Sequence, residues 1–481
     1  MQLLQFRLRL SLAALPALAL LTGCGDGPNE NRPLPAEIHL LSLAEQSGTP
    51  GWALPDSVVV EVLDARGNPI SGVPVSWIST GGGARVGRDA DTTDAAGRAS
   101  AEWTLGLDEG EQTLSITVGQ LDPVVVVAAA TIFHAAFVTL GGQFACALNE
   151  GGQAYCWGMN NQGQLGNGTV GDPVMTPAPV VGNLVFGALT ASSTHACGLA
   201  AGGEAYCWGS NDVGETGTGT MGGSVSAPTP VQTSLRFTQI SAEGTGFVNA
   251  TCGLTAAGEA WCWGDNQFGQ LGDGSTTGSA VPIKVQNSVP FSYIRAGYFH
   301  SCGLATTGEL WCWGEQETDP GAFGARAAGL YTTPVLLHED FRFTQLTTGR
   351  NYTCALTGEG VPYCWGSDLF TGSLGQGEVI EGSAVPLRVT GGHTFVAISS
   401  PSFKETHGLA DGGALYRWGS AGNDVPQATP VRFGQAAFLQ ADGGSEPFGG
   451  GQGTCGIFLT GAVYCAGDDG VTRGVPQPVT P

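Results

Sequence analysis

The stretch CGLTAAGEAWCWG, residues 252–264, decides the fold of this chain because it recurs, with small changes, seven times. Two cysteines ten positions apart mark six of the copies, and in the seventh His407 and Arg417 replace both cysteines. Successive copies begin about 50 residues apart, a spacing typical of one β-propeller blade and not of a helical array. The six pairs are Cys146/Cys156, Cys197/Cys207, Cys252/Cys262, Cys302/Cys312, Cys354/Cys364 and Cys455/Cys465.

Each cysteine pair brackets a predicted β-hairpin. Nine residues separate the two cysteines, so a three-residue loop falls at the midpoint, and its third position is glycine in every copy, as at Gly152 and Gly258. Glycine adopts the left-handed conformation that this loop position favours without the steric cost of a Cβ atom. Counted outward from the loop, Cys146 faces Cys156 at a non-hydrogen-bonded position, where Cα atoms come close enough for a disulfide. The pattern favours six cross-strand disulfides.

Zinc is the alternative partner of the cysteine pairs. Ligand pairs with nine residues between them on rigid opposed strands do not have the usual spacing of a zinc site. In the seventh copy both cysteines are missing together, as expected of a bonded pair. We therefore expect disulfides, with no metal site and no cofactor.

The N-terminus has the pattern of an export signal. Arg7 and Arg9 precede an apolar run over residues 10–21, and the tetrapeptide LTGC then ends at Cys24. This segment resembles the lipobox of bacterial lipoproteins, which implies that residues 1–23 are a cleaved signal peptide and that Cys24 carries lipid. An ordinary cleaved signal and a single transmembrane helix are the alternatives, although the run is short for a membrane span. Cys24 is also the one cysteine of 13 outside the six pairs.

Residues 24–34 comprise this cysteine and a polar, flexible tether with several Gly and Pro residues. The resemblance implies a place in the bacterial cell envelope, outside the cytoplasm, with membrane contact through the lipid anchor only. Because Gly25 and not an aspartate follows the cysteine, we expect the outer membrane in a host that has two membranes. Disulfides persist in such an oxidising compartment.

The composition limits the partners of the chain. The formal net charge is −23, charged residues make up 12%, and the only lysines are Lys284 and Lys404. Such an acidic surface repels phosphate backbones, so we do not expect nucleic-acid binding.

Residues 35–132 show the period-two alternation of β-strands. About seven strands in this length is typical of an immunoglobulin-like sandwich. The runs DARGNP (64–69), VPVSW (73–77) and TDAAGRA (93–99) resemble the bacterial immunoglobulin-like domains of invasin- and intimin-type surface proteins. The resemblance implies a rigid spacer between the membrane and a binding module.

The repeat occupies residues 133–481. One copy contains FSYIRAGYFHSC (291–302), the hairpin with its Trp-Gly, a loop such as NQFGQLGDG (266–274) and a strand such as AVPIKV (280–285). These residues resemble the repeats of the regulator of chromosome condensation and of a secreted β-lactamase-inhibitor protein. The resemblance implies a seven-bladed propeller, so we expect an all-β chain in which an immunoglobulin-like sandwich precedes that propeller.

Three further expectations follow from the register of the copies. Residues 475–481 read as a Pro/Val strand, which we expect to complete the first blade and join the ends of the ring. The tryptophans in register, such as Trp263, are interpreted as packing between blades. His195 and His300 share one repeat position, and a structural hydrogen bond is their expected role.

The loops after each Trp-Gly vary most. Loop 315–334 carries Phe323, Arg326 and Tyr331, and loop 367–386 carries Phe370, residue types enriched at binding hot spots. Neutral drift of the loops is the alternative interpretation. No Gly-x-Ser-x-Gly, Walker or His-Glu-x-x-His motif occurs. We expect a lipid-anchored, cell-envelope binding protein, not an enzyme, whose propeller loops engage a protein or glycan partner.

Two other functions stay open. An extracytoplasmic lyase or hydrolase would use acidic residues at the propeller channel, and clustered carboxylates with raised pKa at one mouth would favour it. A purely structural envelope role is the other. Nucleotide exchange on a small GTPase and chromatin binding, as in the namesake family, are not expected, because the chain is acidic and carries an export signal.

Overall fold

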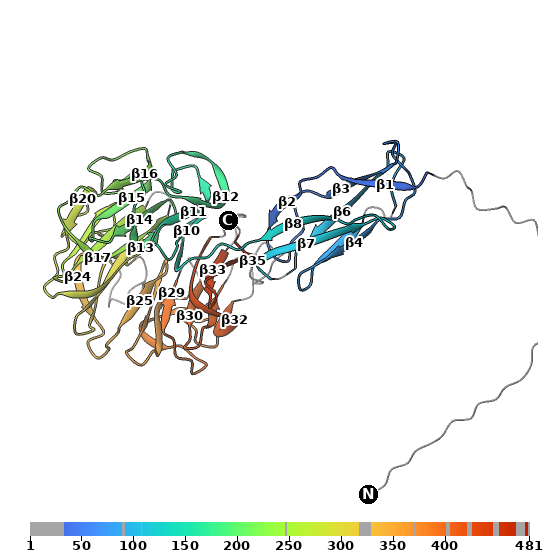
Figure 1. Cartoon of the computed structure of the whole chain (residues 1–481). Helices are drawn as coiled ribbons and strands as arrows, with labels where there is room; N and C mark the ends of the chain where they lie inside the picture. Colours follow the sequence, from blue (N-terminus) through green and yellow to red (C-terminus); the bar gives the residue numbers. More distant parts are fainter. Residues whose placement is uncertain are drawn as a thin grey trace, which may run out of the picture.

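The computed structural model shows a chain built from β-strands, with no helix in the part that it describes. Figure 1 shows two bodies joined end to end, a smaller one near the N-terminus and a larger ring of strands after it. Cys24, Phe323, Arg326 and Phe370 lie outside the described residues. The structure describes residues 33–88, 92–106, 108–245, 248–316, 329–368, 371–400, 405–420, 426–445, 452–467 and 477–479.

The N-terminal body consists of two four-stranded sheets that share one core. Alternate residues of the strands point inward, so that Val58, Val60 and Val62 are fully buried, as are Trp103 and Leu114. The first sheet has the order β1 (Pro35–Leu40), β3 (Val58–Asp64), β6 (Arg98–Thr104) and β5 (Arg85–Arg88). The second has the order β2 (Glu45–Gly48), β8 (Val124–Ala130), β7 (Gly110–Thr117) and β4 (Ser76–Ser79).

The larger body is a propeller whose described strands form seven blades, each with four strands in chain order. The first three blades are separate antiparallel sheets. They comprise β9 (Phe137–Leu140), β10 (Phe144–Leu148), β11 (Ala154–Asn160) and β12 (Gly171–Pro179); β13 (Phe186–Ala191), β14 (His195–Ala200), β15 (Ala205–Ser210) and β16 (Ser224–Pro230); and β17 (Phe237–Thr245), β18 (Val248–Thr255), β19 (Ala260–Gly264) and β20 (Ser279–Lys284).

The fourth and fifth blades are also separate sheets, whereas the sixth and seventh share the long strand β32. The fourth blade comprises β21 (Phe291–Ala296), β22 (His300–Ala305), β23 (Leu310–Gln316) and β24 (Gly329–Leu337), and the fifth comprises β25 (Gln345–Thr348), β26 (Tyr352–Leu356), β27 (Pro362–Ser367) and β28 (Gly382–Arg388). The sixth comprises β29 (Ala397–Ser399), β30 (Glu405–Leu409), β31 (Ala414–Gly419) and the first part of β32 (Gln427–Ser445). The seventh comprises the second part of β32, β33 (Gln452–Phe458), β34 (Val463–Gly467) and β35 (Gln477–Pro478).

Each cysteine pair joins the second and third strands of one blade. Cys146 lies directly opposite Cys156 in the ladder, with an S–S distance of 2.05 Å and a Cα–Cα distance of 4.1 Å. The loop glycines have positive φ, 76° at Gly152 and 77° at Gly258, as the three-residue loop predicts. The other five disulfides have the same register and Cα–Cα distances of 4.0–4.1 Å, and they are Cys197–Cys207, Cys252–Cys262, Cys302–Cys312, Cys354–Cys364 and Cys455–Cys465.

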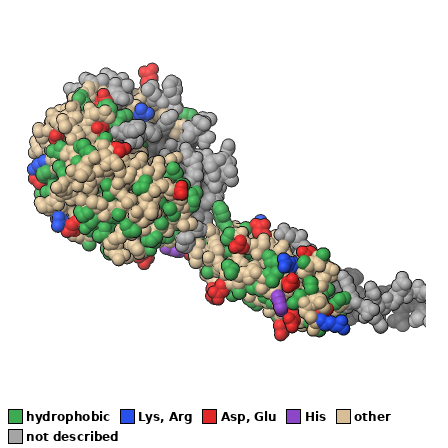
Figure 2. All heavy atoms as spheres, turned by 90° about the horizontal axis from the view of Figure 1, so that it is seen from above, with side chains coloured by type: hydrophobic (Ala, Val, Ile, Leu, Met, Phe, Trp, Pro, Cys, Tyr) green, Lys and Arg blue, Asp and Glu red, His purple; other side chains and the backbone are tan. Residues whose placement is uncertain are grey.

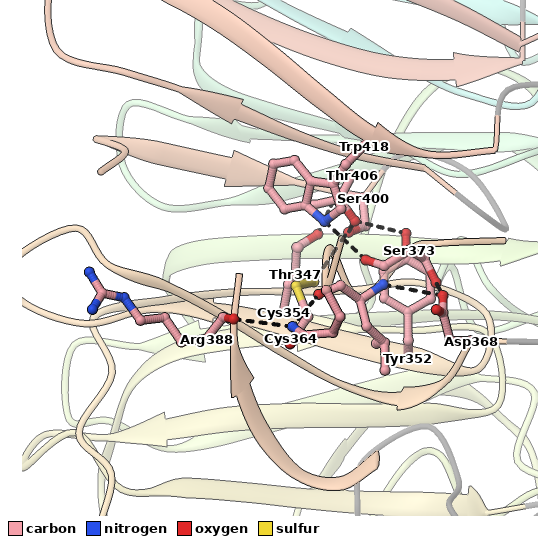
Figure 3. Close-up of a disulfide and its surroundings, with 12 residues drawn as sticks. Thr347, Tyr352, Cys354, Cys364, Asp368, Ser373, Arg388, Ser400, Thr406 and Trp418 are labelled. Carbon is pink, nitrogen blue, oxygen red and sulfur yellow. Dashed lines mark hydrogen bonds between the residues drawn. A yellow bond between two sulfur atoms is a disulfide. The ribbon is translucent and has the colours of Figure 1, made fainter. Parts of the chain in front are cut away.

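The repeated tryptophans lie between blades, as their register predicts. Trp263 is fully buried, and its indole N–H donates to the carbonyl of Glu215 in the preceding blade. Trp418 donates likewise to Ser373, above the Cys354–Cys364 pair in Figure 3. Four blades, those of Trp208, Trp263, Trp313 and Trp418, are therefore fastened in this way to the loop of the blade before them.

The C-terminal tail does not complete the first blade, contrary to the expectation from the sequence. β35 pairs with β34 of the seventh blade, because the first blade already has β12 as its outer strand. The tail still lies at the closure of the ring, where the amide of Phe133 donates to the carbonyl of Val479 at 2.7 Å.

The ring closes with the same contacts that join neighbouring blades. The amide of Ala135, before the first blade, donates to the hairpin carbonyl of Gly461 in the seventh blade at 2.9 Å. In the same way, the amide of Phe186 in the second blade donates to the hairpin carbonyl of Gly152 in the first blade at 2.8 Å. On the inner strands, the side-chain amide of Gln440 pairs with the backbone N–H and C=O of Val138, at 2.8 and 2.7 Å. The first and last blades are thus joined as neighbours.

The two bodies meet at Glu109 and His134. The carboxylate of Glu109 accepts from the amide of Ile132 and lies 3.0 Å from Nε2 of His134. The other ring nitrogen of His134 lies 3.2 Å from the carbonyl of Thr460, in the hairpin of the seventh blade. These contacts join the two bodies at the junction visible in Figure 1.

Candidate functional site

The propeller has two faces that differ in their loops. Because neighbouring strands are antiparallel, the loops after the first and third strands of every blade lie at one end, and the hairpins between the second and third strands lie at the other. We call the first end the loop face and the second the hairpin face. The third strands β23 and β27, which precede the variable loops, end at the loop face.

The innermost strands surround a cavity of about 230 Å³ next to the loop face, which we call the channel mouth. Six of the seven blades contribute to its wall. The lining includes residues 139–142, 190–193, 242–243, 295, 298, 397–400 and 440–442.

The paired cysteines contribute no side chain to the described lining of the channel mouth. The second cysteine of each pair lies on the third strand of its blade, away from the innermost strand that faces the channel. Cys207 and Cys312 are fully buried there, and Cys465 is partly buried against the core between the first and last blades. The disulfides therefore stiffen the blades that carry the site and are not part of its chemistry.

Among the described residues, three charged side chains line the channel mouth: Glu243 on β17, Arg295 on β21 and Asp442 on β32. Withdrawal from water raises the pKa of Glu243 to about 8; the nearby Arg295 and the Gly244 amide oppose this rise, and the negative charge of Asp442 adds to it. Burial likewise raises the pKa of Tyr298 well above its usual value, and the charge of Glu243 adds to that effect.

Arg295 and Asp442 occupy a repeat position that holds hydroxyl side chains in the other blades. Each residue at this position lies opposite the first cysteine position of its blade, as Arg295 lies opposite Cys302 and Asp442 opposite Cys455. In the other five blades the residue is Thr139, Thr190, Ser241, Thr347 or Ser399.

Among the described contacts, four of the five hydroxyls at this position hydrogen bond to a neighbouring blade, and Ser399 is the exception. The hydroxyl of Thr190 accepts a hydrogen bond from the backbone amide of Ala242 in the next blade. The carboxylate of Asp442 likewise accepts one from the backbone amide of Leu140 in the first blade. The sequence analysis did not single out Glu243, Arg295 or Asp442. Aligning the inner strands of the seven copies would have identified the last two as the charged exceptions among hydroxyls.

An aromatic cluster lies elsewhere on the loop face. Phe268 of the third blade meets Phe299 of the fourth edge to face at 4.9 Å, and the guanidinium of Arg350 in the fifth blade lies 5.7 Å from the Phe299 ring. Both phenylalanines are partly exposed and Arg350 is exposed. Three blades thus present an aromatic–arginine surface, which the sequence analysis missed because it considered only the irregular loops.

Of the four predicted loop residues, the structure describes one. Tyr331 lies on β24 opposite Gly314, and its side chain packs against the core between the fourth and fifth blades. The ring is partly buried, like those of Phe268 and Phe299. The cluster of Phe268, Phe299 and Arg350 is a second candidate on the loop face.

The two predicted structural histidines are buried and hydrogen bonded between blades. The ring nitrogens of His195 lie 2.6 Å from the Ser192 hydroxyl and 2.8 Å from the Thr251 hydroxyl of the next blade. Burial lowers the pKa of His195 to about 3 and that of His300 to about 4. Both are therefore neutral parts of the blade interfaces at physiological pH.

The described residues contain no group of three or more His, Cys, Asp or Glu that could hold a metal ion. No helix in the part of the chain described is long and apolar enough to cross a membrane. Figure 2 shows acidic and basic side chains scattered singly over the visible described surface, without a gathering of Lys and Arg.

Part of this propeller matches the regulator of chromosome condensation (RCC1) repeat. One RCC1 repeat profile matches residues 151–198 and 257–304, and a second matches residues 136–164, 188–215 and 237–270. The matches span the first four repeats, and the chain therefore contains RCC1 repeats.

Two curated relatives from Arabidopsis thaliana resemble this chain. The ultraviolet-B receptor UVR8 is 27% identical over 310 residues, which cover 61% of this chain and 69% of the receptor. The mitochondrial RCC1 domain-containing protein RUG3 is 28% identical over 328 residues, which cover 64% of this chain and 60% of that protein.

Two solved structures share the propeller fold. Human WBSCR16 aligns with a TM-score of 0.57 and 16% identity, covering 68% of this chain and 94% of that structure. Yeast RCC1 (Prp20), bound to Kap60, aligns with a TM-score of 0.56 and 20% identity, covering 67% of this chain and 80% of that structure. At this identity the likeness concerns the fold alone.

Proposed function

We propose that this chain is a lipid-anchored binding protein of the bacterial cell envelope, and that the loop face of its propeller engages a protein or glycan partner. The observation that carries the proposal is the cluster of Phe268, Phe299 and Arg350, which joins three blades on that face. Aromatic and arginine side chains dominate binding hot spots, and a stiff scaffold lowers the entropy lost on binding.

The N-terminal body has the role of a spacer in this proposal. Its two sheets around one core suit an immunoglobulin-like sandwich, spanning residues 35–132. The contact of Glu109 with His134 would hold the propeller at a fixed distance from the tether. Cys24 would carry the lipid, and the anchor would be the only membrane contact.

Other RCC1-type propellers have partners that we do not propose here. Prp20p of Saccharomyces cerevisiae, 20% identical with a TM-score of 0.55, is described with its binding properties to Gsp1p and histones. The formal charge of −23 is unfavourable for contact with nucleic acid, and the export signal would separate this chain from a cytoplasmic GTPase.

Lipidation can be tested without knowledge of the partner. Cells that express the chain would be grown with a clickable fatty acid, and the intact mass of the purified protein would be measured. We expect labelled protein that starts at Cys24, and unlabelled protein from Cys24→Ser. Labelling that survives Cys24→Ser would refute this anchor.

A second candidate function is supported by the channel mouth. Glu243, with a pKa raised to about 8, lies in one cavity with Asp442, as expected of a general acid in a lyase or hydrolase. Screening glycan and ester substrates against the wild type and Glu243→Gln would test it. Turnover abolished by this substitution would favour the enzyme over the binding protein.

A further inference from the structure

One paired cysteine of the propeller differs from all the others in its exposure. Eleven of the 12 are fully buried, whereas Cys465, on β34 of the seventh blade, is partly exposed. In thiol–disulfide exchange a thiolate must reach one sulfur of the bond, so access largely decides which disulfide reacts. The Cys455–Cys465 bond is therefore the disulfide most open to a dissolved thiol in the folded chain.

The outer strand beside this cysteine is short. β35 consists of Gln477 and Pro478 and pairs with β34 at two positions, one of which is Cys465 itself. In the first five blades the outer strand has six to nine residues. Among the described strands, β34 thus has less strand pairing on its outer side than the corresponding strands of those blades.

The sequence after β34 also lacks a motif that covers other disulfides. Loops of the form Gly-x-Leu-Gly place Leu165, Leu271 and Leu374 in the same core as the disulfide of their blade. The carbonyl before each of these leucines accepts from the tryptophan of the next blade, at 2.8–3.0 Å. Residues 468–474, DDGVTRG, contain no such motif. Accordingly, the buried indole N–H of Trp157 in the first blade has no partner among the described residues.

An unpaired tryptophan alone does not expose a disulfide. The indole N–H of Trp365 also lacks a described partner, yet the Cys302–Cys312 disulfide in the same core is fully buried. At the junction of the first and last blades, which we call the closing seam, Trp157 shares its core with the Cys455–Cys465 disulfide. Among the described blade junctions, only the closing seam combines an unpaired tryptophan with a partly exposed cysteine.

This disulfide joins the two strands through which the seventh blade contacts the first. Cys455 lies on β33, which pairs with β32, the strand that carries the ring-closing Gln440. Cys465 lies on β34, where the amide of Val463 donates to the carbonyl of Phe133 at 2.8 Å. Loss of the crosslink would let β33 and β34 separate more easily, and both sets of contacts across the closing seam would weaken.

We propose that the Cys455–Cys465 disulfide is a redox-sensitive crosslink, which a dithiol reduces while the other five disulfides stay intact, and that its reduction loosens the closing seam. A thiolate of the dithiol attacks Sγ of Cys465, the S–S bond breaks, and Cys455 leaves as a thiolate that takes up a proton. The second thiolate of the dithiol then attacks the mixed disulfide and releases Cys465, which is protonated in turn. The dithiol ends as a disulfide, and its two protons end on the two cysteines.

This inference is independent of the proposed partner of the loop face. The cluster of Phe268, Phe299 and Arg350 lies on the third to fifth blades, whereas the closing seam joins the seventh and the first. Failure of either proposal would leave the other standing.

The experiment is graded reduction of the folded, purified chain with dithiothreitol. Free thiols are alkylated at intervals and located by peptide mass mapping, at concentrations of reductant that leave the circular dichroism of the protein native. We expect Cys455 and Cys465 to be alkylated at least about ten-fold faster than the other pairs, because those pairs react only after local opening of their blades.

Hydrogen exchange provides the second readout. After selective reduction, the amides of β9 and β34 should exchange faster, whereas those of β18 and β19 in the third blade should be unchanged. Cys455→Ser/Cys465→Ser should reproduce this pattern. The matched control Cys252→Ser/Cys262→Ser should leave β9 and β34 protected.

Reduction of the wild type decides the question even if the serine variants fail to fold. The proposal is overturned if another pair is alkylated first, if all six pairs react together, or if none reacts while the chain stays folded. It is also overturned if selective reduction of Cys455–Cys465 leaves the exchange of β9 and β34 unchanged.

Discussion

His407 faces Arg417 across the sixth blade, at the register position where each of the other six blades holds a cysteine pair. Oε1 of Glu405 lies 3.6 Å from both the His407 ring and the Arg417 guanidinium. Burial would raise the pKa of Glu405, but these two neighbours hold it below its usual value. A cluster of His407, Arg417 and Glu405 thus replaces the disulfide, and Glu405 is its buried centre.

This arrangement predicts that a seventh disulfide can be introduced. His407→Cys with Arg417→Cys would leave the Glu405 carboxylate buried without these two partners, so Glu405→Ala should accompany them. We expect the triple variant, once oxidised, to gain about 2–3 kcal/mol in free energy of unfolding over its reduced form. Denaturant unfolding with and without reductant, after counting free thiols, would measure the gain. Two free thiols that persist under oxidising conditions would contradict the predicted register.

Acid should weaken the propeller through its buried histidines. His195 and His300 have pKa values of about 3 and 4 in the folded chain and 6.5 as free side chains. Below pH 6.5 the unfolded chain therefore binds protons that the folded chain does not, and stability falls as the pH falls, by up to about 1.4 kcal/mol per pH unit for each histidine.

Replacing both histidines by glutamine should flatten the dependence of unfolding free energy on pH between 6 and 4. The exposed His39 supplies the control, because His39→Gln should leave the slope unchanged. Parallel curves for the wild type and the double variant would show that these histidines are not buried neutral groups.

Glu243 should have the opposite pH dependence. Its pKa is about 8 in the folded chain against 4.5 for the free side chain, so between these values the folded state retains a proton that the unfolded state has lost. Stability is then lost as the pH rises from 4.5 to 8. Glu243→Gln should be stabilised relative to the wild type progressively over this range, by up to about 1.4 kcal/mol per pH unit. The exposed Glu150→Gln serves as control, and a difference that does not grow with pH would refute the assignment.

The tail should stabilise the whole ring although it pairs with the seventh blade. Val479 is buried against Phe133 and Trp157, so deletion of residues 475–481 exposes the junction of the first and last blades. We expect a loss of a few kcal/mol in free energy of unfolding, from apolar burial and two backbone hydrogen bonds. Val385→Ala, at an exposed valine of β28, should change little. Unchanged unfolding of the truncated chain would contradict this closure.

The blades could be predicted because the sequence of each repeat contains the local signals of its own hairpin. Ten-residue spacing and a glycine at the third loop position fix the register of Cys252 against Cys262. The blade that the C-terminal tail joins could not be assigned in the same way, because the tail sequence resembles the outer strand of any blade. Only the structure shows that β12 already forms the outer strand of the first blade, so that the tail pairs with the seventh.

The channel mouth was missed for a different reason. Glu243, Arg295 and Asp442 lie on three strands that are distant in sequence and come together only when the ring closes. A search for motifs along the chain does not detect such a set. Aligning the seven copies of the repeat position by position identifies Arg295 and Asp442 as charged residues at a position that otherwise holds Ser or Thr. It does not identify the cavity that they share with Glu243.

The most direct test of the central claim is photo-crosslinking capture from an envelope extract of the host. On the hairpin face, the exposed Arg236 and Arg342 pair with Glu204 and Glu309, which follow the hairpin glycines. The baits would be the wild type, the loop-face variant Phe268→Ala/Phe299→Ala/Arg350→Ala and the hairpin-face variant Arg236→Ala/Arg342→Ala, each with a confirmed native melt. We predict that one partner is retained by the wild type and the hairpin-face variant and lost by the loop-face variant, and that the purified partner binds the loop-face variant at least about ten-fold more weakly. A partner held equally by the loop-face variant, or no reproducible partner, would contradict a binding role for the loop face.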